Sequence, residues 1–234
     1  MALYNDIRDD IYKKINDGTY PEGATIPSEI ELSSSYHASR STVRHALQLL
    51  VDEGYLERRK KRGTIVTRPK VDQFAATGIR SFAEEQANVG REIRTTVINF
   101  KRERANTEVS KALGLHGKSE VYRLVRLRYV DDRTNVFVES YIPCDLYPGF
   151  DEYDFTTERL YGAMSDKGRP VVRAHRRLSV IKADSAMSAL LDVAVGDPLI
   201  LMHTIGWDET GAAVEYSIAT YRGDDNVFDF DVVK

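Results

Sequence analysis

The sequence has almost no cysteine. Its 234 residues include a single one, Cys144, so an intramolecular disulfide is impossible and a disulfide-stapled secreted domain is excluded. A single cysteine is typical of a protein from a reducing compartment. Because no histidine motif lies near Cys144, we expect a half-buried residue at the end of a strand rather than a nucleophile.

Long apolar runs are also missing. No run approaches the roughly 18 residues of a transmembrane helix. The first residues, MALYNDIRDDIYKK, alternate apolar and charged side chains and do not form the apolar core of a signal peptide. We therefore expect a cytoplasmic protein without a membrane partner.

The motifs of common enzymes and metal sites are absent as well. The chain contains no GxSxG, no P-loop and no HExxH. The five histidines show no metal-ligand spacing: His37, His45, His116, His175 and His203. We expect no catalytic residue, no metal and no cofactor.

The chain lacks an overall positive charge, since its net charge is -3. The first 70 residues nevertheless carry 12 Lys and Arg against 10 Asp and Glu, and the remainder carries 21 against 26. Residues 58–70 contain seven basic side chains and no acid. Such a run is either a solvated surface or a phosphate contact, and its place in the fold decides between them.

The amino-terminal third predicts two helices before residue 37. An apolar side chain at every fourth residue from Leu3 to Ile15 predicts the first helix. Ser28 and Glu31 have the spacing of a capping box, in which each side chain satisfies a free amide at the start of a second, short helix.

A third helix is expected after Ser39, its predicted N-cap. The apolar face of this helix consists of Val43, Ala46, Leu47, Leu50 and Val51. Arg40, Arg44 and Gln48 fall on the opposite face, flanked by Ser41. Two arginines near the start of a helix that follows a short helix and a tight turn are typical of a recognition helix.

The segment that follows Gly54 indicates a strand, a basic turn and a second strand. The turn consists of Lys60, Lys61, Arg62 and Gly63. A helical bundle with a surface hairpin explains the apolar stripes, but not why the outward face of the third helix and the hairpin tip are both basic. We therefore predict a winged helix-turn-helix whose wing tip meets duplex DNA.

The rest of the chain predicts a second domain. Residues 69–77 lack periodicity and are the expected linker between a DNA-binding domain, residues 1–68, and a domain of residues 78–234. The second domain contains a repeat in which a short helix precedes a β-hairpin, with the first strands offset by 78 residues. The hairpin loop is expected to be two residues shorter in the second copy. The fold class is thus a two-domain α/β protein with a pseudo-symmetric α+β sheet domain.

Polar side chains interrupt the predicted hairpins. Period two places Arg126 and Arg128 on one face. Glu139 and Glu215 are expected in equivalent places of the two copies, and Tyr221 shares the face of Glu215. Arginine forks and carboxylates suit a small polar metabolite. A solvated sheet face with cross-strand Arg–Glu pairs explains the same pattern, and the pattern alone does not separate the two.

The first 66 residues resemble a known family. The segment LYNDIRDDIYKKINDGTYPEGATIPSEIELSSSYHASRSTVRHALQLLVDEGYLERRKKRGTIV is similar, without a gap, to the DNA-binding domain of GntR-family bacterial repressors. The resemblance implies that Ser28 bonds a phosphate, Arg40 and Arg44 contact bases, Ser41 and Thr42 touch the backbone, and the wing reaches the minor groove.

Two positions depart from the family pattern. The family commonly has arginine where this chain has Ile30, and Gln-Gly where this chain has Lys60-Lys61. We therefore expect a DNA contact that depends more on phosphate charge, and hence a steep salt dependence.

The second domain resembles the UTRA domain of the HutC subfamily, through the segments VYRLVRLRYV, VFVESYIP, ADSAMSALLDVAVGDPLILMHTIGW and VEYSIATYRGD. The resemblance implies a fold similar to chorismate lyase. It also implies effector contacts from Arg126, Arg128, Glu139, Glu215 and Tyr221, and backbone amides from a loop that includes Ser81 and Phe82. Arg159 stands where relatives often have serine, which suggests a ligand other than the amino-sugar phosphates that some relatives bind, or one with additional negative charge.

Two classes of function follow. In the first, a small, anionic, polar effector controls the affinity of a homodimeric repressor for a palindromic operator. Whether the effector relieves or promotes DNA binding stays open. In the second class, Glu139 and Glu215 act as a general acid and base in an enzyme. A DNA-reading module is more commonly fused to a sensor, so we expect a regulator.

Overall fold

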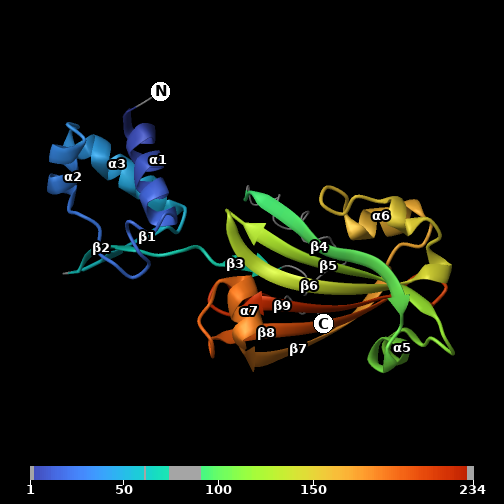
Figure 1. Cartoon of the computed structure of the whole chain (residues 1–234). Helices are drawn as coiled ribbons and strands as arrows, with labels where there is room; N and C mark the ends of the chain where they lie inside the picture. The colour runs from blue at the N-terminus through green and yellow to red at the C-terminus, as the bar shows by residue number, and fades with distance from the viewer. Residues whose placement is uncertain (1–2, 61, 74–90, 231–234) are drawn as a thin grey trace. The chain divides into compact units, whose positions relative to one another are not determined.

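The computed structural model describes residues 3–60, 62–73 and 91–230. They form two compact units, residues 1–70 and residues 71–234 (Figure 1). The boundary lies inside the predicted linker, residues 69–77. The linker prediction differs from the structure at one place, because Val71–Gln73 forms a strand, β3, of the second unit.

Three helices build the amino-terminal unit: α1 (Leu3–Asn16), α2 (Glu29–Ser35) and α3 (Arg40–Asp52). The predicted stripe of α1 is buried from Ile7 to Ile15, but Leu3 is 52% exposed because it lies at the very start of the helix. The predicted apolar face of α3 is buried from Val43 to Leu50, and it packs against α1 and α2.

Local capping sets where α2 and α3 begin. The Ser28 hydroxyl accepts a hydrogen bond from the Glu31 amide at 3.3 Å, while the Ser28 amide donates to the Glu31 carboxylate at 2.8 Å. The predicted capping box is therefore present. Ser39 caps α3 by accepting from the Thr42 amide at 3.2 Å. Between the helices His37 has a φ of 50°, which makes the turn tight.

The predicted wing is an antiparallel hairpin of β1 (Leu56–Arg59) and β2 (Gly63–Val66). Leu56 pairs with Val66 at its base, and both side chains join the helical core. A bridge between Thr25 and Ile65 connects the hairpin to the loop before α2. Its base is thus fixed to the body of the unit.

The second unit is built on a six-stranded antiparallel sheet with the order β4-β5-β6-β9-β8-β7. The strands are β4 (Ile93–Arg104), β5 (Glu120–Val130), β6 (Arg133–Pro143), β7 (Arg173–Lys182), β8 (Pro198–Trp207) and β9 (Ala213–Arg222). A separate parallel pair joins β3 to β10 (Asn226–Phe228). The connections include the 3-10 turns η2 (Cys144–Leu146) and η3 (Phe150–Glu152).

The internal repeat is larger than predicted. Each copy is a long strand, a short helix and a hairpin: β4, α5 (Thr107–Leu113), β5 and β6, then β7, α7 (Ser185–Leu191), β8 and β9. The copies meet at the β6–β9 pair in the middle of the sheet, so the sheet is pseudo-symmetric as predicted.

The prediction for the hairpin loops was wrong. The first hairpin turns at Asp131 and Asp132, whose φ values of 49° and 63° are those of a type I′ turn. The second hairpin turns over residues 208–212 and is therefore the longer of the two. Asp208 accepts hydrogen bonds from the Thr210 and Ala212 amides and so shapes this longer loop.

The two faces of the sheet carry different helices. Leu113 of α5 and Leu191 of α7 pack on the face that also holds Tyr141 and Tyr216. Helix α6 (Leu160–Asp166) packs with η2 and η3 on the opposite face, around Tyr122. Figure 1 shows α6 on one side of the sheet and α5 and α7 on the other.

Candidate nucleic-acid interface and effector cavity

Hydroxyl groups and a cation gather at the start of α3. The Ser39 hydroxyl lies 2.8 Å from the hydroxyls of both Ser41 and Thr42. Arg40 begins the helix and is exposed, as is Ser41. A helix amino terminus carries partial positive charge and free amides, so this cluster suits a phosphate group. Sequence and structure place Arg40, Ser41 and Thr42 together.

Arg44 lies one turn further along α3 and is held by an acid. Its Nε lies 3.2 Å and 3.1 Å from the two carboxylate oxygens of Glu29, and its Nη2 lies 2.8 Å from Oε2. The Nη2 of Arg58, on β1, approaches the same carboxylate at 3.9 Å. Hydrogen bonds from Arg44 hold the pKa of Glu29 below its ordinary value. No local sequence pattern marks Glu29 as part of this surface.

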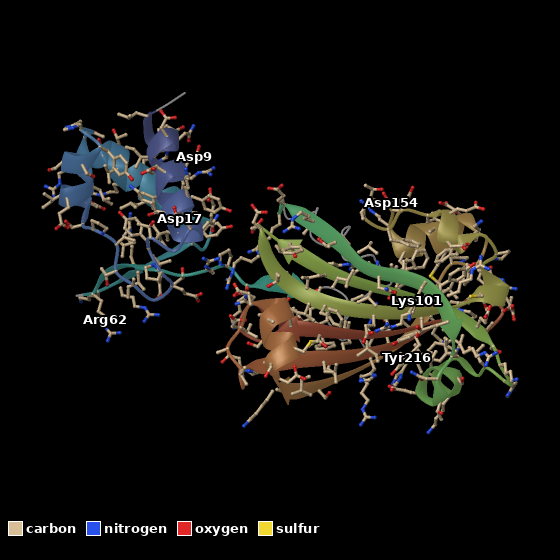
Figure 2. All side chains as sticks on the ribbon, in the orientation of Figure 1. Asp9, Asp17, Arg62, Lys101, Asp154 and Tyr216 are labelled. Atoms are coloured by element: carbon tan, nitrogen blue, oxygen red, sulfur yellow. The ribbon has the colours of Figure 1, made fainter. Side chains whose placement is uncertain are left out.

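The wing tip is exposed and basic. Lys60, Arg62 and Gly63 are all exposed, and Figure 2 shows Arg62 extending from the hairpin. Gly63 has a φ of 86°, and a Cβ there would lie 3.0 Å from the Thr25 side chain, so the turn requires glycine. The predicted contact Lys61 lies outside the described residues.

Two further side chains lie on the exposed surface beside Glu29. Ser28 is exposed, and its hydroxyl also donates to the Glu31 carboxylate at 2.7 Å. Ile30 is 58% exposed. A large apolar side chain therefore stands at the position where the family commonly has arginine.

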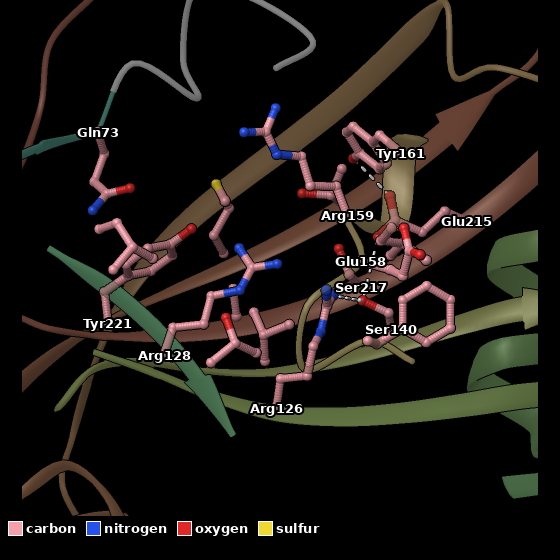
Figure 3. Close-up of a pocket in the computed structure, with 18 of the residues that line it drawn as sticks. Gln73, Arg126, Arg128, Ser140, Glu158, Arg159, Tyr161, Glu215, Ser217 and Tyr221 are labelled. Atoms are coloured by element: carbon pink, nitrogen blue, oxygen red, sulfur yellow. Dashed lines mark hydrogen bonds between the residues drawn. The ribbon is translucent and has the colours of Figure 1, made fainter. Parts of the chain in front are cut away.

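A cavity of about 290 Å³ lies on the α6 face of the sheet (Figure 3). Its charged lining consists of Arg126, Arg128, Arg159, Arg176, Glu158 and Glu215. Cationic side chains thus outnumber anionic ones. In Figure 3, Gln73 and Tyr221 lie at one end, Tyr161 and Glu215 lie at the other, and Arg128 lies between them.

A chain of hydrogen bonds crosses the buried end of this cavity. Arg126 Nη2 donates to the Ser140 hydroxyl at 3.1 Å, and that hydroxyl lies 3.4 Å from Glu215 Oε1. The Tyr161 hydroxyl donates to Glu215 Oε2 at 2.7 Å. Burial, followed by the charge of Glu215, raises the pKa of Tyr161 well above its ordinary value, so the phenol stays protonated.

Arg126 is a buried cation with an unsatisfied nitrogen. Its residue is 3% exposed, and its Nε is buried without a hydrogen-bond partner. Burial, and then the nearby charge of Arg128, lower the pKa of the Arg126 guanidinium well below its ordinary value. A guanidinium remains protonated in proteins, so this unfavourable burial favours an anion beside it.

The structure brings together Arg126, Arg128, Arg159, Glu215 and Tyr221 of the predicted effector site. Arg159 approaches from the start of α6 and is exposed. The predicted contacts Ser81 and Phe82 lie outside the described residues. The predicted group is therefore assembled from two strands, β5 and β9, and the start of α6.

Glu139 is not in the cavity, which corrects its predicted place. It points to the opposite face of the sheet and forms an ion pair with Arg123, whose Nε lies 3.1 Å from Glu139 Oε1. The cause is a β-bulge: Arg128 pairs with Val136 but Tyr129 pairs with Thr134, so Asn135 is an extra residue in β6. The predicted acid–base pair of Glu139 and Glu215 is consequently not formed.

Several lining residues were not predicted from the sequence. They include Gln73, Ser140, Tyr161, Arg176 and Thr204. Ser140 and Thr204 alternate with residues of the other face, so a correct strand register would have found them. Gln73 lies in the predicted linker, and no local pattern marks it.

Gln73 connects the cavity to the strand that opens the second unit. It is 1% exposed, its Nε2 donates to Asn226 at 2.7 Å, and its Oε1 is buried without a partner. Asn135, the bulge residue, donates to the same Asn226 oxygen at 3.1 Å. A ligand that donates a hydrogen bond to Gln73 would therefore contact β3 directly.

The other reactive side chains of the described residues do not form a metal site. Among the described residues, no three His, Cys, Asp or Glu side chains gather in a way that could hold a metal ion. Cys144 is half-buried just after β6, and burial raises its pKa to about 11, so the thiol is protonated. None of the helices in the described ranges is long and apolar enough to cross a membrane.

Two families match the two units. Residues 3–66 match the family described as bacterial regulatory proteins, gntR family, and residues 88–226 match the UTRA domain. The HTH-type transcriptional repressor NagR of Bacillus subtilis (strain 168) is 29% identical over 228 residues, which cover 97% of this chain and 93% of that protein. A probable fructoselysine utilization operon transcriptional repressor of Escherichia coli (strain K12) is 30% identical, over 93% and 89% of the two chains.

A solved structure has the same two-part architecture. PhnF from Mycobacterium smegmatis superposes with a TM-score of 0.72 at 25% identity, and the match covers 97% of this chain and 99% of that one. The two curated relatives are named as transcriptional repressors, which confirms the family resemblance and the expectation of a regulator. The chain belongs to the gntR family of bacterial transcription regulators and carries a UTRA domain, the combination expected of the HutC subfamily.

Proposed function

We propose that the cavity of the second unit binds a small, anionic, polar metabolite, such as a sugar phosphate or an organic acid. The observation that carries this proposal is Arg126, a buried guanidinium whose Nε has no partner. Arg128, Arg159 and Arg176 add positive charge around the same space. Glu215 and Ser140 supply acceptors for hydroxyl groups of the ligand, since sugars and hydroxy acids carry both functions.

The amino-terminal unit is proposed to bind operator DNA through α3 and the wing. Arg40 and Arg44 contact bases, and the hydroxyls and wing cations contact phosphates. The proposed contact residues are Ser28, Arg40, Ser41, Thr42, Arg44, Lys60, Lys61, Arg62 and Gly63. The support is the exposure of most of the described members, which lie at the starts of α2 and α3 and at the hairpin tip: Ser28, Arg40, Ser41, Arg44, Lys60, Arg62 and Gly63.

The two activities are proposed to be linked in a repressor that acts in the cytoplasm. Two relatives are named as transcriptional repressors. Helix-turn-helix proteins commonly read palindromes as dimers, so we propose a homodimer on a palindromic operator. An effector that favours one state of the dimer changes operator affinity by the difference between its affinities for the two states.

Thermal unfolding of the purified protein tests the ligand class. Sugar phosphates, organic acids and amino-acid derivatives are added in turn, and a ligand at 100 times its Kd stabilises the folded state by about 2.7 kcal/mol. We expect anionic compounds to stabilise the wild type and not Arg126→Met, while both proteins bind DNA equally. Equal stabilisation of the two proteins by the same compound would contradict the proposed binding site at Arg126.

A further inference from the structure

Glu29 is an acid surrounded by the bases of the proposed DNA contact. It is the first residue of α2, directly after the Ser28 cap, and its side chain is 25% exposed. Arg44 of α3 and Arg58 of β1 both approach its carboxylate. A negative charge in this place opposes the approach of a phosphate backbone, so its presence requires an explanation.

The Glu29–Arg44 ion pair contributes little to the stability of the fold. The Arg44 side chain is 60% exposed, and an ion pair with a partner so exposed contributes little to folding. The pair is nevertheless bidentate, with three nitrogen–oxygen distances between 2.8 and 3.2 Å. This geometry fixes the plane of the Arg44 guanidinium before DNA arrives.

The bonding pattern leaves one edge of Arg44 available for DNA. Glu29 takes the Nε and Nη2 edge of the guanidinium. The end edge, with the Nη1 hydrogens and the outer Nη2 hydrogen, is the fork that pairs with O6 and N7 of guanine in the major groove. We propose that Glu29 is a positioning residue that orients Arg44 for an end-on, bidentate contact with one guanine of each half-site.

The orientation of Arg44 by Glu29 affects discrimination among DNA sequences rather than overall affinity. With Glu29 in place, Arg44 is pre-organised for a base and is partly neutralised for phosphates. Without Glu29, the same arginine is mobile and carries its full charge toward any phosphate. The carboxylate thus weakens binding to random DNA and strengthens discrimination among bases.

The chain offers a matched control in the wing. Glu57 of β1 forms a similar pair with Arg59, with Nε to Oε2 at 2.9 Å and Nη2 to Oε2 at 2.8 Å. Both residues of this pair are exposed, and neither contacts Arg44 in the structure. Removing Glu57 therefore deletes one negative charge near the proposed interface without releasing Arg44.

Selection of duplexes from a random pool by the full-length protein, at about 0.15 M salt, tests the proposal. The proteins compared are the wild type, Glu29→Ala, Glu29→Gln, Arg44→Ala and Glu57→Ala. The inference rests on the proposed base contact of Arg44. We expect Glu29→Ala to lose roughly 5- to 100-fold of preference at one guanine per half-site, the position that Arg44→Ala also loses. Glu29→Gln keeps one acceptor and is expected to be intermediate.

Affinity for a random-sequence duplex provides the second readout. Glu29→Ala is expected to bind it more tightly than the wild type, and Arg44→Ala less tightly. Glu57→Ala keeps the wild-type guanine preference. An unchanged preference in Glu29→Ala, or an equal loss in Glu57→Ala, overturns the inference alone. A wild type that selects no sequence overturns the proposed operator binding together with the inference.

Discussion

At the scale of single residues, the cavity contains a buried guanidinium with an unsatisfied nitrogen. Arg126 is buried, and its Nε lacks a partner, while Glu215 at the same end accepts from Tyr161 and lies within reach of Ser140. The acid thus has protein partners for both oxygens, whereas the Nε of the base has none. Residues that weaken the free protein in this way are commonly retained for ligand recognition.

Replacing this arginine by an apolar residue of similar length is expected to stabilise the ligand-free protein. Arg126→Met removes a buried charge whose Nε has no partner, and we expect the free energy of unfolding to rise by about 1 kcal/mol. Arg177→Met, on an exposed arginine of β7, is the control and should change stability by less than about 0.5 kcal/mol. Denaturant unfolding measures both variants. A marked destabilisation by Arg126→Met would show that the guanidinium is already compensated.

A second prediction at this scale concerns acid stability. Burial raises the pKa of Asp208, but hydrogen bonds from Thr210, Arg169 and the Ala212 amide outweigh it and hold the pKa below its ordinary value. A lowered carboxyl pKa contributes stability that is present above about pH 4 and is lost as the pH falls through the folded-state pKa.

We therefore expect Asp208→Asn to lower the free energy of unfolding by about 2 kcal/mol at pH 7. The variant should also lose less stability than the wild type between pH 5 and pH 3, since one titrating carboxyl has been removed. Urea unfolding across this pH range measures both effects. Parallel curves of unfolding free energy against pH for the two proteins would contradict a lowered pKa of Asp208.

At the scale of secondary structure elements, strand register decides which side chains reach the cavity. Helix starts were predictable because a cap is a local signal: Ser28 and Ser39 precede α2 and α3 as predicted. The face of Glu139 was not predictable, because the extra residue Asn135 in β6 reverses the alternation beyond it. The bulge is stabilised by Asn226, which is distant in the sequence.

The hydrogen bonds of Asn226 are expected to stabilise the β3–β10 pair and the bulge of β6. Asn226 Oδ1 accepts from Gln73 and Asn135, and its Nδ2 donates to the Arg222 carbonyl at 2.8 Å. Asn226→Ala leaves buried donors unsatisfied, so we expect a loss of about 2 kcal/mol or more in unfolding free energy. Asn99→Ala, on an exposed asparagine of β4, is the control. Equal stabilities of the two variants would argue that the cluster is not coupled to folding.

The basic tip of the wing is expected to contribute to the salt dependence of DNA binding. Each phosphate contact contributes about 0.9 to the slope of log Kd against log salt concentration. Replacing Lys60 and Arg62 together by Gln is therefore expected to reduce this slope by up to about 1.8, with no change in base preference. Lys13→Gln, an exposed residue of α1, should leave the slope unchanged. An unaltered slope in the wing variant would exclude phosphate contacts by its tip.

At the scale of the whole molecule, the sequence revealed the repeat but not the cavity. The 78-residue offset between α5 and α7 is visible in the sequence, and it predicted the paired halves of the sheet. The cavity combines side chains from β3, both halves of the sheet and the start of α6. Gln73 and Arg176 line the cavity only because the fold brings distant segments together, so no single segment of the sequence predicts them.

The central claim is that occupation of the cavity changes operator affinity. The most direct measurement is the Kd of the full-length protein for a selected duplex, with and without a saturating compound that stabilises the wild type in thermal unfolding. We expect a change of roughly 5- to 150-fold in the wild type and no change in Arg126→Met, whose DNA affinity without the compound equals that of the wild type. A wild-type Kd that is the same with and without the bound compound would contradict the account.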